Sequence, residues 1–193
     1  MVIRAPADDV REKASRIRFL LTDVEGVLTD AGVYYSAKGE ELKRFSMRDG
    51  MGFERLLSLA GVRVGIITRE NSTIVAARAA KLNVGALYTG VTDKLAKAEQ
   101  IARQQGMPLS RMAFIGDDVN DLTLLQAVGI SACPSDADPS VLGIVDLICT
   151  RAGGHGAFRE FAEFLIDAHV NAPASRGRTL AAAGATLVTP REV

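Results

Sequence analysis

Short apolar runs alternate with amphipathic segments along most of the chain. Uninterrupted apolar runs of strand length lie at residues 17–23, 62–68, 112–117, 129–134 and 145–150. Such runs are typical of strands that are buried on both faces of a parallel sheet. Segments with helical spacing of apolar residues lie between them, at residues 51–61, 71–83, 92–106 and 119–129. The alternation predicts an α/β fold in which a three-layer parallel sheet is built through right-handed crossovers.

One segment breaks this rhythm directly after the first predicted strand. Two arms with alternating side chains, "GVYYS" (residues 32–36) and "ELKRFSM" (residues 41–47), flank the polar "AKGE". This pattern predicts an inserted β-hairpin. We expect residues 1–170 to form a single domain. Residues 171–193 are small, contain Pro and Gly and lack periodicity, which predicts a flexible C-terminal tail.

The composition narrows the classes of partner. The 193 residues, 48% of them hydrophobic, can bury a sizeable core. Lys and Arg number 23 and Asp and Glu also number 23, so the formal net charge is zero. No global field would then attract nucleic acid or an anionic membrane, and we expect neither partner. Any anionic ligand must be held by local groups.

Targeting and redox signals favour a cytoplasmic location. The N-terminal segment lacks the apolar core of a secretory leader, and no apolar run reaches the roughly 18 residues that span a bilayer. Cys133 and Cys149 are too few for a disulfide framework and lie in no metal-binding pattern. We therefore expect a protein of a reducing, cytoplasmic compartment.

Carboxylates and a few other polar groups follow the predicted strands. Asp23 and Glu25 come after the first strand, Thr68 ends the second, and "GDDVND" with Asp117 follows the strand at 112–117. Lys94 lies in the first turn of the helix predicted from residue 92. Ligands of open α/β sheets bind beyond the carboxyl ends of the strands, so we expect these groups to converge there.

Such a cluster predicts phosphoryl-transfer chemistry. Neighbouring carboxylates repel one another unless a cation lies between them, and a set of oxygen ligands selects Mg²⁺, which commonly bridges to a substrate phosphate. Asp23 can then attack phosphorus as a nucleophile, while Thr68 and Lys94 hold the phosphoryl oxygens. Glu25 can act as general acid and later as general base.

The same residues resemble the four motifs of the haloacid dehalogenase-like phosphatases, matched by "DVEGVLTD", Thr68, Lys94 and "GDDVND". Three further segments, "GVYYSAKGEELKRFSMRDGMG", "DKLAKAEQ" and "RAGGHGAFREF", resemble a capless subgroup of that family. The subgroup includes 3-deoxy-D-manno-octulosonate 8-phosphate phosphatase and the nonulosonate 9-phosphate phosphatases. The resemblance implies a Rossmann-like domain without a large cap, Mg²⁺, and a homotetramer in which hairpins form a central barrel and neighbouring subunits close each active site.

The resemblance also implies roles for individual residues. Asp23 matches the nucleophile and a metal ligand, Asp117 matches a further metal ligand, and Glu25 would give its backbone carbonyl to the metal. Thr68 and Lys94 match the phosphate-binding positions. The positions that match the substrate contacts of the family are Ser46, Met47, Arg48, Asp49, Gly50 and Arg78.

Two positions depart from the family pattern. The second carboxylate of the first motif is usually Asp, so Glu25 is either a longer acid or a sign of lost activity. Glu70 occupies the position at which the octulosonate phosphatases have an arginine that faces the substrate. Together with Lys81, Glu70 resembles a pair of residues found in the nonulosonate 9-phosphate branch. The segment "FSMRDG" is closer to the octulosonate branch. Both sugar acid phosphates therefore stay open as substrates.

Two other classes of function compete with a phosphatase. The first is a catalytically weak or inactive oligomerisation module, because the same fold occurs fused to sialate cytidylyltransferases; Glu25 favours this hypothesis. The second is a response-regulator receiver, which also gathers Asp, Thr and Lys around Mg²⁺. Its paired acids precede the phosphoacceptor strand, whereas Glu25 follows Asp23. The leading hypothesis is a Mg²⁺-dependent phosphatase that acts on a 2-keto-3-deoxy sugar acid phosphate.

Overall fold

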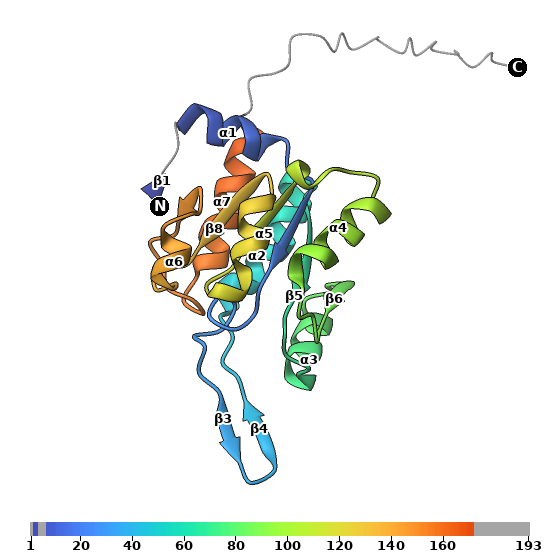
Figure 1. Cartoon of the computed structure of the whole chain (residues 1–193), viewed down its shortest axis with the longest axis vertical. Coiled ribbons are helices and arrows are strands. Elements are labelled where there is room, and N and C mark those ends of the chain that lie inside the picture. The colour runs from blue at the N-terminus through green and yellow to red at the C-terminus, as the bar shows by residue number, and fades with distance from the viewer. Residues whose placement is uncertain (1, 4–6, 172–193) are drawn as a thin grey trace, which may run out of the picture.

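A mostly parallel sheet forms the middle layer of the protein (Figure 1). The computed structural model describes residues 2–3 and 7–171 of the chain. Within this part the strand order is β1-β9-β8-β7-β2-β5-β6, and only β1 runs antiparallel to its neighbour. The strands are β1 (Val2–Ile3), β2 (Phe19–Thr22), β5 (Arg63–Ile67), β6 (Ala86–Tyr88), β7 (Met112–Ile115), β8 (Ile130–Cys133) and β9 (Leu147–Ile148). The predicted parallel sheet is confirmed.

Helices cover both faces of this sheet and give the three predicted layers. One face carries α1 (Ala7–Ser15), α2 (Met47–Ala60), α3 (Thr73–Lys81) and α7 (Ala157–Val170). The other face carries α4 (Lys94–Gln104), α5 (Leu122–Ala127) and α6 (Pro139–Leu142). Short 3₁₀ turns lie at Leu109–Arg111 and Val119–Asp121.

The central strand β2 shows why an uninterrupted apolar run predicts this layer. All four of its residues are buried. Successive side chains of a strand point to opposite faces, so Leu20 joins the core under α2 and α7, while Phe19 and Leu21 join the core under α4 and α5. A polar residue on either face would lie in a hydrophobic core, and the strand is therefore apolar up to Thr22, whose hydroxyl is satisfied by the backbone carbonyl of Asp23.

The predicted hairpin is present and protrudes from the carboxyl-end side of the sheet (Figure 1). It pairs β3 (Tyr34–Ser36) with β4 (Gly39–Leu42) in antiparallel fashion. Its second strand is shorter than the predicted arm at 41–47, and helix α2 begins at Met47 rather than at residue 51. The reason is local: the Ser46 hydroxyl accepts hydrogen bonds from the backbone N–H groups of Arg48 and Asp49 and so caps the helix there.

Several elements were not predicted, although the helical spacing of apolar residues in the last of them is clear from the sequence. They are β1, β6, α1, α6 and α7. The insertion between β2 and α2 is the hairpin alone, so no large cap domain occurs in the described chain. The predicted tail lies, from residue 172 onward, outside the described residues. None of the helices within residues 7–171 is long and apolar enough to cross a membrane.

Candidate active site

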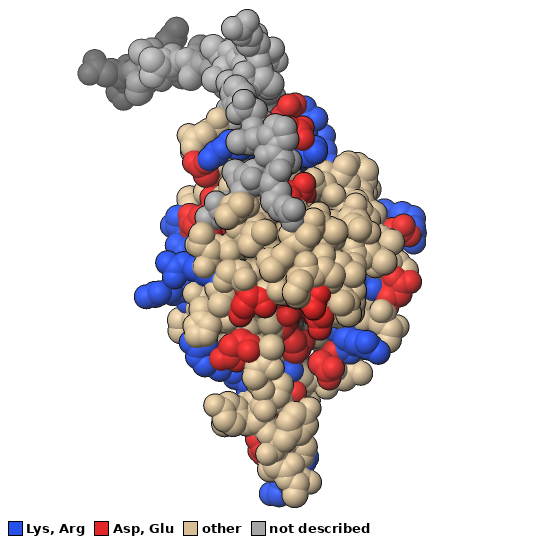
Figure 2. Space-filling view, turned by 60° about the vertical axis from the view of Figure 1, so that its left-hand side comes forward, with Lys and Arg blue, Asp and Glu red and all other residues tan. Residues whose placement is uncertain are grey.

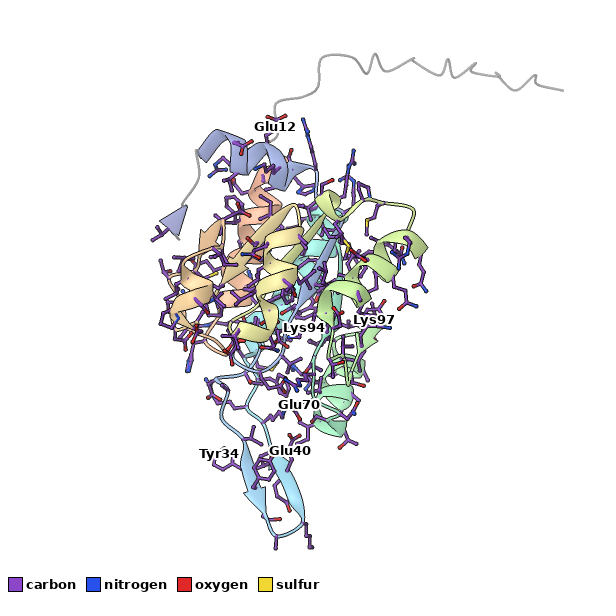
Figure 3. The ribbon with its side chains drawn as sticks, in the orientation of Figure 1. Glu12, Tyr34, Glu40, Glu70, Lys94 and Lys97 are labelled. Atoms are coloured by element: carbon purple, nitrogen blue, oxygen red, sulfur yellow. The ribbon has the colours of Figure 1, made fainter. Side chains whose placement is uncertain are left out.

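Three strand ends bring the predicted chemical groups to one rim of the sheet. Asp23 directly follows β2, Thr68 directly follows β5, and Asp117 lies just after β7, the neighbour of β2. Lys94 is the first residue of α4. Figure 2 shows acidic side chains gathered where the hairpin meets the body of the molecule. Figure 3 places Lys94 and Glu70 in that region.

Lys94 holds two carboxylates together inside the protein. Its Nζ atom lies 2.6 Å from Oδ2 of Asp23 and 2.6 Å from Oδ1 of Asp121, and all three side chains are shielded from solvent. Burial lowers the pKa of Lys94, but the two carboxylates outweigh it and hold the pKa above its ordinary value. Burial, followed by the charge of Asp121, raises the pKa of Asp23 well above its usual range, against the opposing effect of Lys94.

Two glycines make room for the carboxylates. Oδ2 of Asp121 accepts a hydrogen bond of 3.0 Å from the backbone N–H of Asp117. A Cβ atom on Gly116 would lie 2.4 Å from the same Oδ2 atom. A Cβ atom on Gly26, whose φ is 72°, would lie 1.9 Å from Oδ2 of Asp117. Only glycine allows this close approach of backbone and carboxylate, so the "EG" and "GDD" steps of the sequence shape the cluster.

The cluster fits a hard divalent cation. Oxygen atoms of Asp23, Asp117 and Asp121 all lie within 4.8 Å of one another. If all three carboxylates were ionised, the ammonium of Lys94 would leave two uncompensated negative charges in this shielded site. Burial and the neighbouring charge of Asp121 raise the pKa of Asp117 to about 7. Oxygen-only donors with this charge match the ligand preference of Mg²⁺.

Glu25 projects to a different part of the rim. Its Oε2 atom accepts a hydrogen bond of 2.7 Å from the Thr68 hydroxyl, and its Oε1 atom is paired with the ammonium group of Lys43. The carboxylate of Glu25 is thus not one of the three clustered metal-ligand carboxylates. The assignment of its backbone carbonyl to a metal stays a prediction. Glu25 nevertheless shares a pocket of about 300 Å³ with Asp23 and Asp117.

Glu70 is the predicted substrate residue that lies at this pocket. The residues that line the pocket are Asp23, Glu25, Ala31, Arg69, Glu70, Asp117, Asp118, Val119 and Asn120. The backbone N–H of Glu70 also donates a hydrogen bond of 3.1 Å to the Thr68 hydroxyl. The exposed Glu70 carboxylate is therefore placed where it can meet the part of a substrate that extends away from the phosphoryl group.

The predicted loop at residues 46–50 forms the first turn of α2 and lines no part of this pocket. Ser46 caps the helix, whereas Met47 and Arg48 are exposed. The buried Asp49 accepts hydrogen bonds from the backbone N–H groups at the start of α7, at Gly156 (3.1 Å) and Arg159 (2.9 Å). Burial raises the pKa of Asp49. Within one chain this carboxylate joins α2 to α7.

Gly50, Arg78 and Lys81 also lie away from the acidic cluster. The guanidinium of Arg78 donates a hydrogen bond of 3.0 Å to the backbone carbonyl of Ser46. A Cβ atom on Gly50 would lie 2.7 Å from that guanidinium, so the glycine makes room for it. Lys81 lines a separate pocket with Phe19 and other residues near the amino ends of β2 and β5. Substrate contacts by these residues across a subunit boundary stay a prediction.

Two residues of the site were not assigned a role from the sequence. Asp121 belongs to the "GDDVND" segment, four residues after Asp117. This spacing could have indicated that the two residues lie on the same turn of the backbone, with their carboxylates close together. Lys43 gave no such signal, because a lysine in "ELKRF" reads as a solvated residue of a hairpin arm. Its position at the site depends on how the hairpin packs.

The chain matches known proteins over most of its length. A sequence profile of the haloacid dehalogenase-like hydrolases matches residues 66–160. The 3-deoxy-D-manno-octulosonate 8-phosphate phosphatase of Escherichia coli (strain B / BL21-DE3) is 35% identical over 172 residues, which cover 89% of this chain and 91% of the relative. The crystal structure of the phosphatase of that name from Yersinia pestis is 36% identical, has a TM-score of 0.81 and covers 86% of this chain and 89% of its own.

A third similar protein was solved with ligands. The 3-deoxy-D-manno-octulosonate 8-phosphate phosphatase from Moraxella catarrhalis, in complex with a magnesium ion, a phosphate ion and a KDO molecule, is 32% identical. Its TM-score is 0.81, and the match covers 86% of this chain and 95% of that one.

The fold, the acidic cluster and the similarity to these proteins together define the class of protein. This chain belongs to the haloacid dehalogenase-like hydrolases. Within that family, its similarity is to the 3-deoxy-D-manno-octulosonate 8-phosphate phosphatases over nearly the whole described domain.

Proposed function

We propose that this chain is a Mg²⁺-dependent phosphomonoester hydrolase that acts on 3-deoxy-D-manno-octulosonate 8-phosphate through an aspartyl-phosphate intermediate on Asp23. The observation that carries the proposal is the convergence of Asp23, Asp117, Asp121 and Lys94 at one rim of the sheet. Relatives that cover most of the chain are phosphatases by name, which supports a catalytic protein over an inactive assembly module.

Asp23 acts as the nucleophile, and Glu25 acts first as general acid and then as general base. An oxygen of Asp23 forms a bond to phosphorus while the bond from phosphorus to the sugar oxygen breaks, and Glu25 gives a proton to that sugar oxygen. In the second half, Glu25 takes a proton from water as the water oxygen attacks phosphorus. The bond from Asp23 to phosphorus then breaks, and inorganic phosphate leaves.

Other residues bind and orient the phosphoryl group. The Lys94 ammonium lies beside Asp23, where it can donate a hydrogen bond to a phosphoryl oxygen. The Thr68 hydroxyl donates to Oε2 of Glu25 in this structure and would turn to a phosphoryl oxygen when substrate binds, which leaves Oε2 free to carry the transferred proton. Asp23, Asp117 and Asp121 would hold Mg²⁺. When bound, this ion supplies positive charge that offsets both the carboxylates and the substrate phosphate.

The substrate follows from the relatives and from one residue of the pocket. The named relatives of Escherichia coli, Yersinia pestis and Moraxella catarrhalis carry the octulosonate 8-phosphate in their names, which favours that sugar acid. Glu70 lines the pocket with a carboxylate that can accept hydrogen bonds from sugar hydroxyls. This feature keeps a nonulosonate 9-phosphate, with its longer hydroxylated tail, as the second candidate.

We infer a homotetramer as the working assembly. Tyr34, Tyr35 and Leu42 on the hairpin are 67%, 72% and 63% exposed, which is unusual for such large apolar side chains in a lone subunit. Packing against other copies of the hairpin would cover them. Light scattering coupled to gel filtration should give four times the 20.5 kDa mass of the chain.

We place the enzyme in the cytoplasm. Cys133 and Cys149 are both buried, and two cysteines are too few for the disulfide framework typical of a secreted protein. Cell fractionation should recover the phosphatase activity with cytoplasmic markers.

A release assay for inorganic phosphate tests the proposal. Wild-type protein with Mg²⁺ is offered a panel of eight- and nine-carbon 2-keto-3-deoxy sugar acid phosphates. We expect turnover of the octulosonate 8-phosphate that stops with Asp23→Asn and with chelation of Mg²⁺. Turnover of the nonulosonate 9-phosphate alone would select the second candidate. No turnover of any compound would exclude the phosphatase.

A further inference from the structure

Lys43 is shielded from water and lies between two carboxylates at the base of the hairpin. Its side chain is 1% exposed, and its ammonium group pairs with Oε1 of Glu25 and lies 3.2 Å from Oε2 of Glu40. Burial lowers the pKa of Lys43, but hydrogen bonding and charge from Glu25 and Glu40 outweigh it, so the group stays protonated. A lysine in this setting is a fixed charge rather than a solvated surface residue.

Glu25 is held at both oxygens by this arrangement. Lys43 contacts one oxygen, and the Thr68 hydroxyl donates a hydrogen bond of 2.7 Å to the other. A glutamate has one more rotatable bond than an aspartate, so more conformational entropy is lost when its side chain is ordered. Contacts at both oxygens remove that freedom before substrate binds. They offset the drawback of a longer acid, because an acid that wanders is a poor proton donor.

The hairpin and α3 in turn hold Lys43. Glu40 belongs to β4, and its carboxylate accepts a hydrogen bond from the hydroxyl of Ser72, the residue that caps α3. Figure 3 shows Glu40 on the hairpin, directed toward the region that contains Glu70 and Lys94. A continuous series of contacts therefore runs from the cap of α3 through Glu40 and Lys43 to Glu25.

We propose that Lys43 is a positioning residue that fixes the carboxylate of Glu25 for proton transfer to the leaving sugar oxygen, and that Glu40 anchors Lys43 from the hairpin. This inference rests on the proposed phosphatase function. Lys43 is not among the residues that line the pocket with Asp23 and Asp117, so it acts through Glu25. Removal of its ammonium group leaves Asp23 and Lys94 intact but releases the acid.

Leaving-group dependence tests this role. Lys43→Met keeps the length of the side chain and removes its charge. We expect kcat/KM for 3-deoxy-D-manno-octulosonate 8-phosphate to fall about 10- to 100-fold, with the loss in kcat and little change in KM. For p-nitrophenyl phosphate, whose leaving group needs little protonation, kcat/KM should fall less than about threefold. Lys38→Met, at the exposed turn of the same hairpin, is the matched control and should leave both substrates unaffected.

A double-mutant cycle separates positioning from other roles. In a Glu25→Gln background the acid is absent, so adding Lys43→Met should change kcat/KM by less than about twofold. A full additional loss in that background, or a rise in KM without a change in kcat, would overturn the proposal because Lys43 would then act on the substrate directly. An unchanged kcat/KM for the sugar phosphate in Lys43→Met would also overturn it.

A second variant guards against misfolding. Glu40→Gln leaves Lys43 in place but weakens its anchor, and we expect the same substrate-dependent pattern with a smaller loss. Equal losses for both substrates, in a variant whose melting temperature and oligomeric state match the wild type, would contradict the proposal. Failure of the proposed function itself would look different, because wild-type protein would then release phosphate from neither substrate.

Discussion

Two shielded lysines each lie between a pair of carboxylates, and their surroundings differ. Lys94 joins Asp23 to Asp121, and all three residues come from the rim of the central sheet and the helices beside it. Lys43 joins Glu25 to Glu40 at the base of the hairpin, where Glu25 and Glu40 are 26% and 21% exposed. The first arrangement is built into the core, and the second depends on how an inserted segment packs.

The difference indicates a division of labour. Groups set on the sheet and its helices are positioned by the packed core, which suits the groups that we propose to bind the metal and the phosphoryl oxygens. The position of the Lys43 ammonium depends on how the hairpin packs, so a substitution in the hairpin can change it without altering the core cluster. The chain thus places the proposed nucleophile, Asp23, directly after a buried central strand and the proposed acid, Glu25, beside the exposed hairpin.

Loss of Lys94 should have the largest effect. Lys94→Met leaves Asp23 and Asp121 side by side without their cation and removes a donor to the phosphoryl group. We expect turnover to fall at least about 10³-fold and stability to fall by about 3 kcal/mol. Steady-state kinetics and urea unfolding at neutral pH measure both. Lys97→Met, one turn later on α4, is the control; a comparable loss there, or a smaller loss than in Lys43→Met, would reverse the proposed ranking.

Shortening the acid should have the next largest effect. Glu25→Asp draws the carboxylate back from Lys43 and Thr68 by roughly 1 Å, a displacement that can cost about 100-fold in rate. We expect lower kcat/KM for the sugar phosphate even though Asp is the usual residue of the family. Higher turnover in Glu25→Asp than in the wild type would instead mean that the longer side chain impairs catalysis.

Mg²⁺ binding at the cluster of Asp23, Asp117 and Asp121 should depend on pH. Lys94 offsets part of the charge of Asp23 and Asp121, while burial and Asp121 keep the pKa of Asp117 at about 7 without metal. Below that pH the metal-free site holds a proton that Mg²⁺ must displace. The association constant should therefore fall as the pH drops below about 7. Calorimetric titrations across this range measure it; a flat profile, or the same slope in Asp117→Asn, would contradict the assignment.

Substitution of an exposed lysine, Lys13, should have the smallest effect and serves as the reference for the two shielded lysines. Lys13 lies 2.8 Å from Asp9 on α1, with about half of each side chain exposed. Solvent screens such a pair, so Lys13→Met should change stability by less than about 0.5 kcal/mol and leave kinetics unchanged. A loss here as large as in Lys94→Met would mean that burial does not distinguish the lysines.

The central sheet and the core cluster could be predicted from the sequence because both follow from local rules. Uninterrupted apolar runs identify β2, β5 and β7, and polar groups at the ends of parallel strands must meet at one rim. The predicted start of helix α2, at residue 51, lies after the observed start at Met47, because the capping role of Ser46 was not recognised. The three-residue strand β6 is only half-buried and gives little signal.

The hairpin-dependent part of the site could not be predicted in the same way. The hairpin itself was evident from its alternation, but the place where Lys43 meets Glu25 depends on the path of the backbone between β2 and α2. Residues 46–50 show the converse case: their family resemblance implied substrate contacts, while their position within one chain is the first turn of α2. Neighbouring subunits are needed to test those contacts.

A crystal structure of the protein with Mg²⁺ and beryllofluoride tests the central claim most directly. Beryllofluoride mimics a phosphoryl group on a carboxylate, so the account predicts an adduct on Asp23, one Mg²⁺ ion in contact with both Asp23 and Asp117, and Lys94 and Thr68 against the fluorine atoms. An adduct on another residue, or an ion that Asp23 and Asp117 do not share, would contradict it.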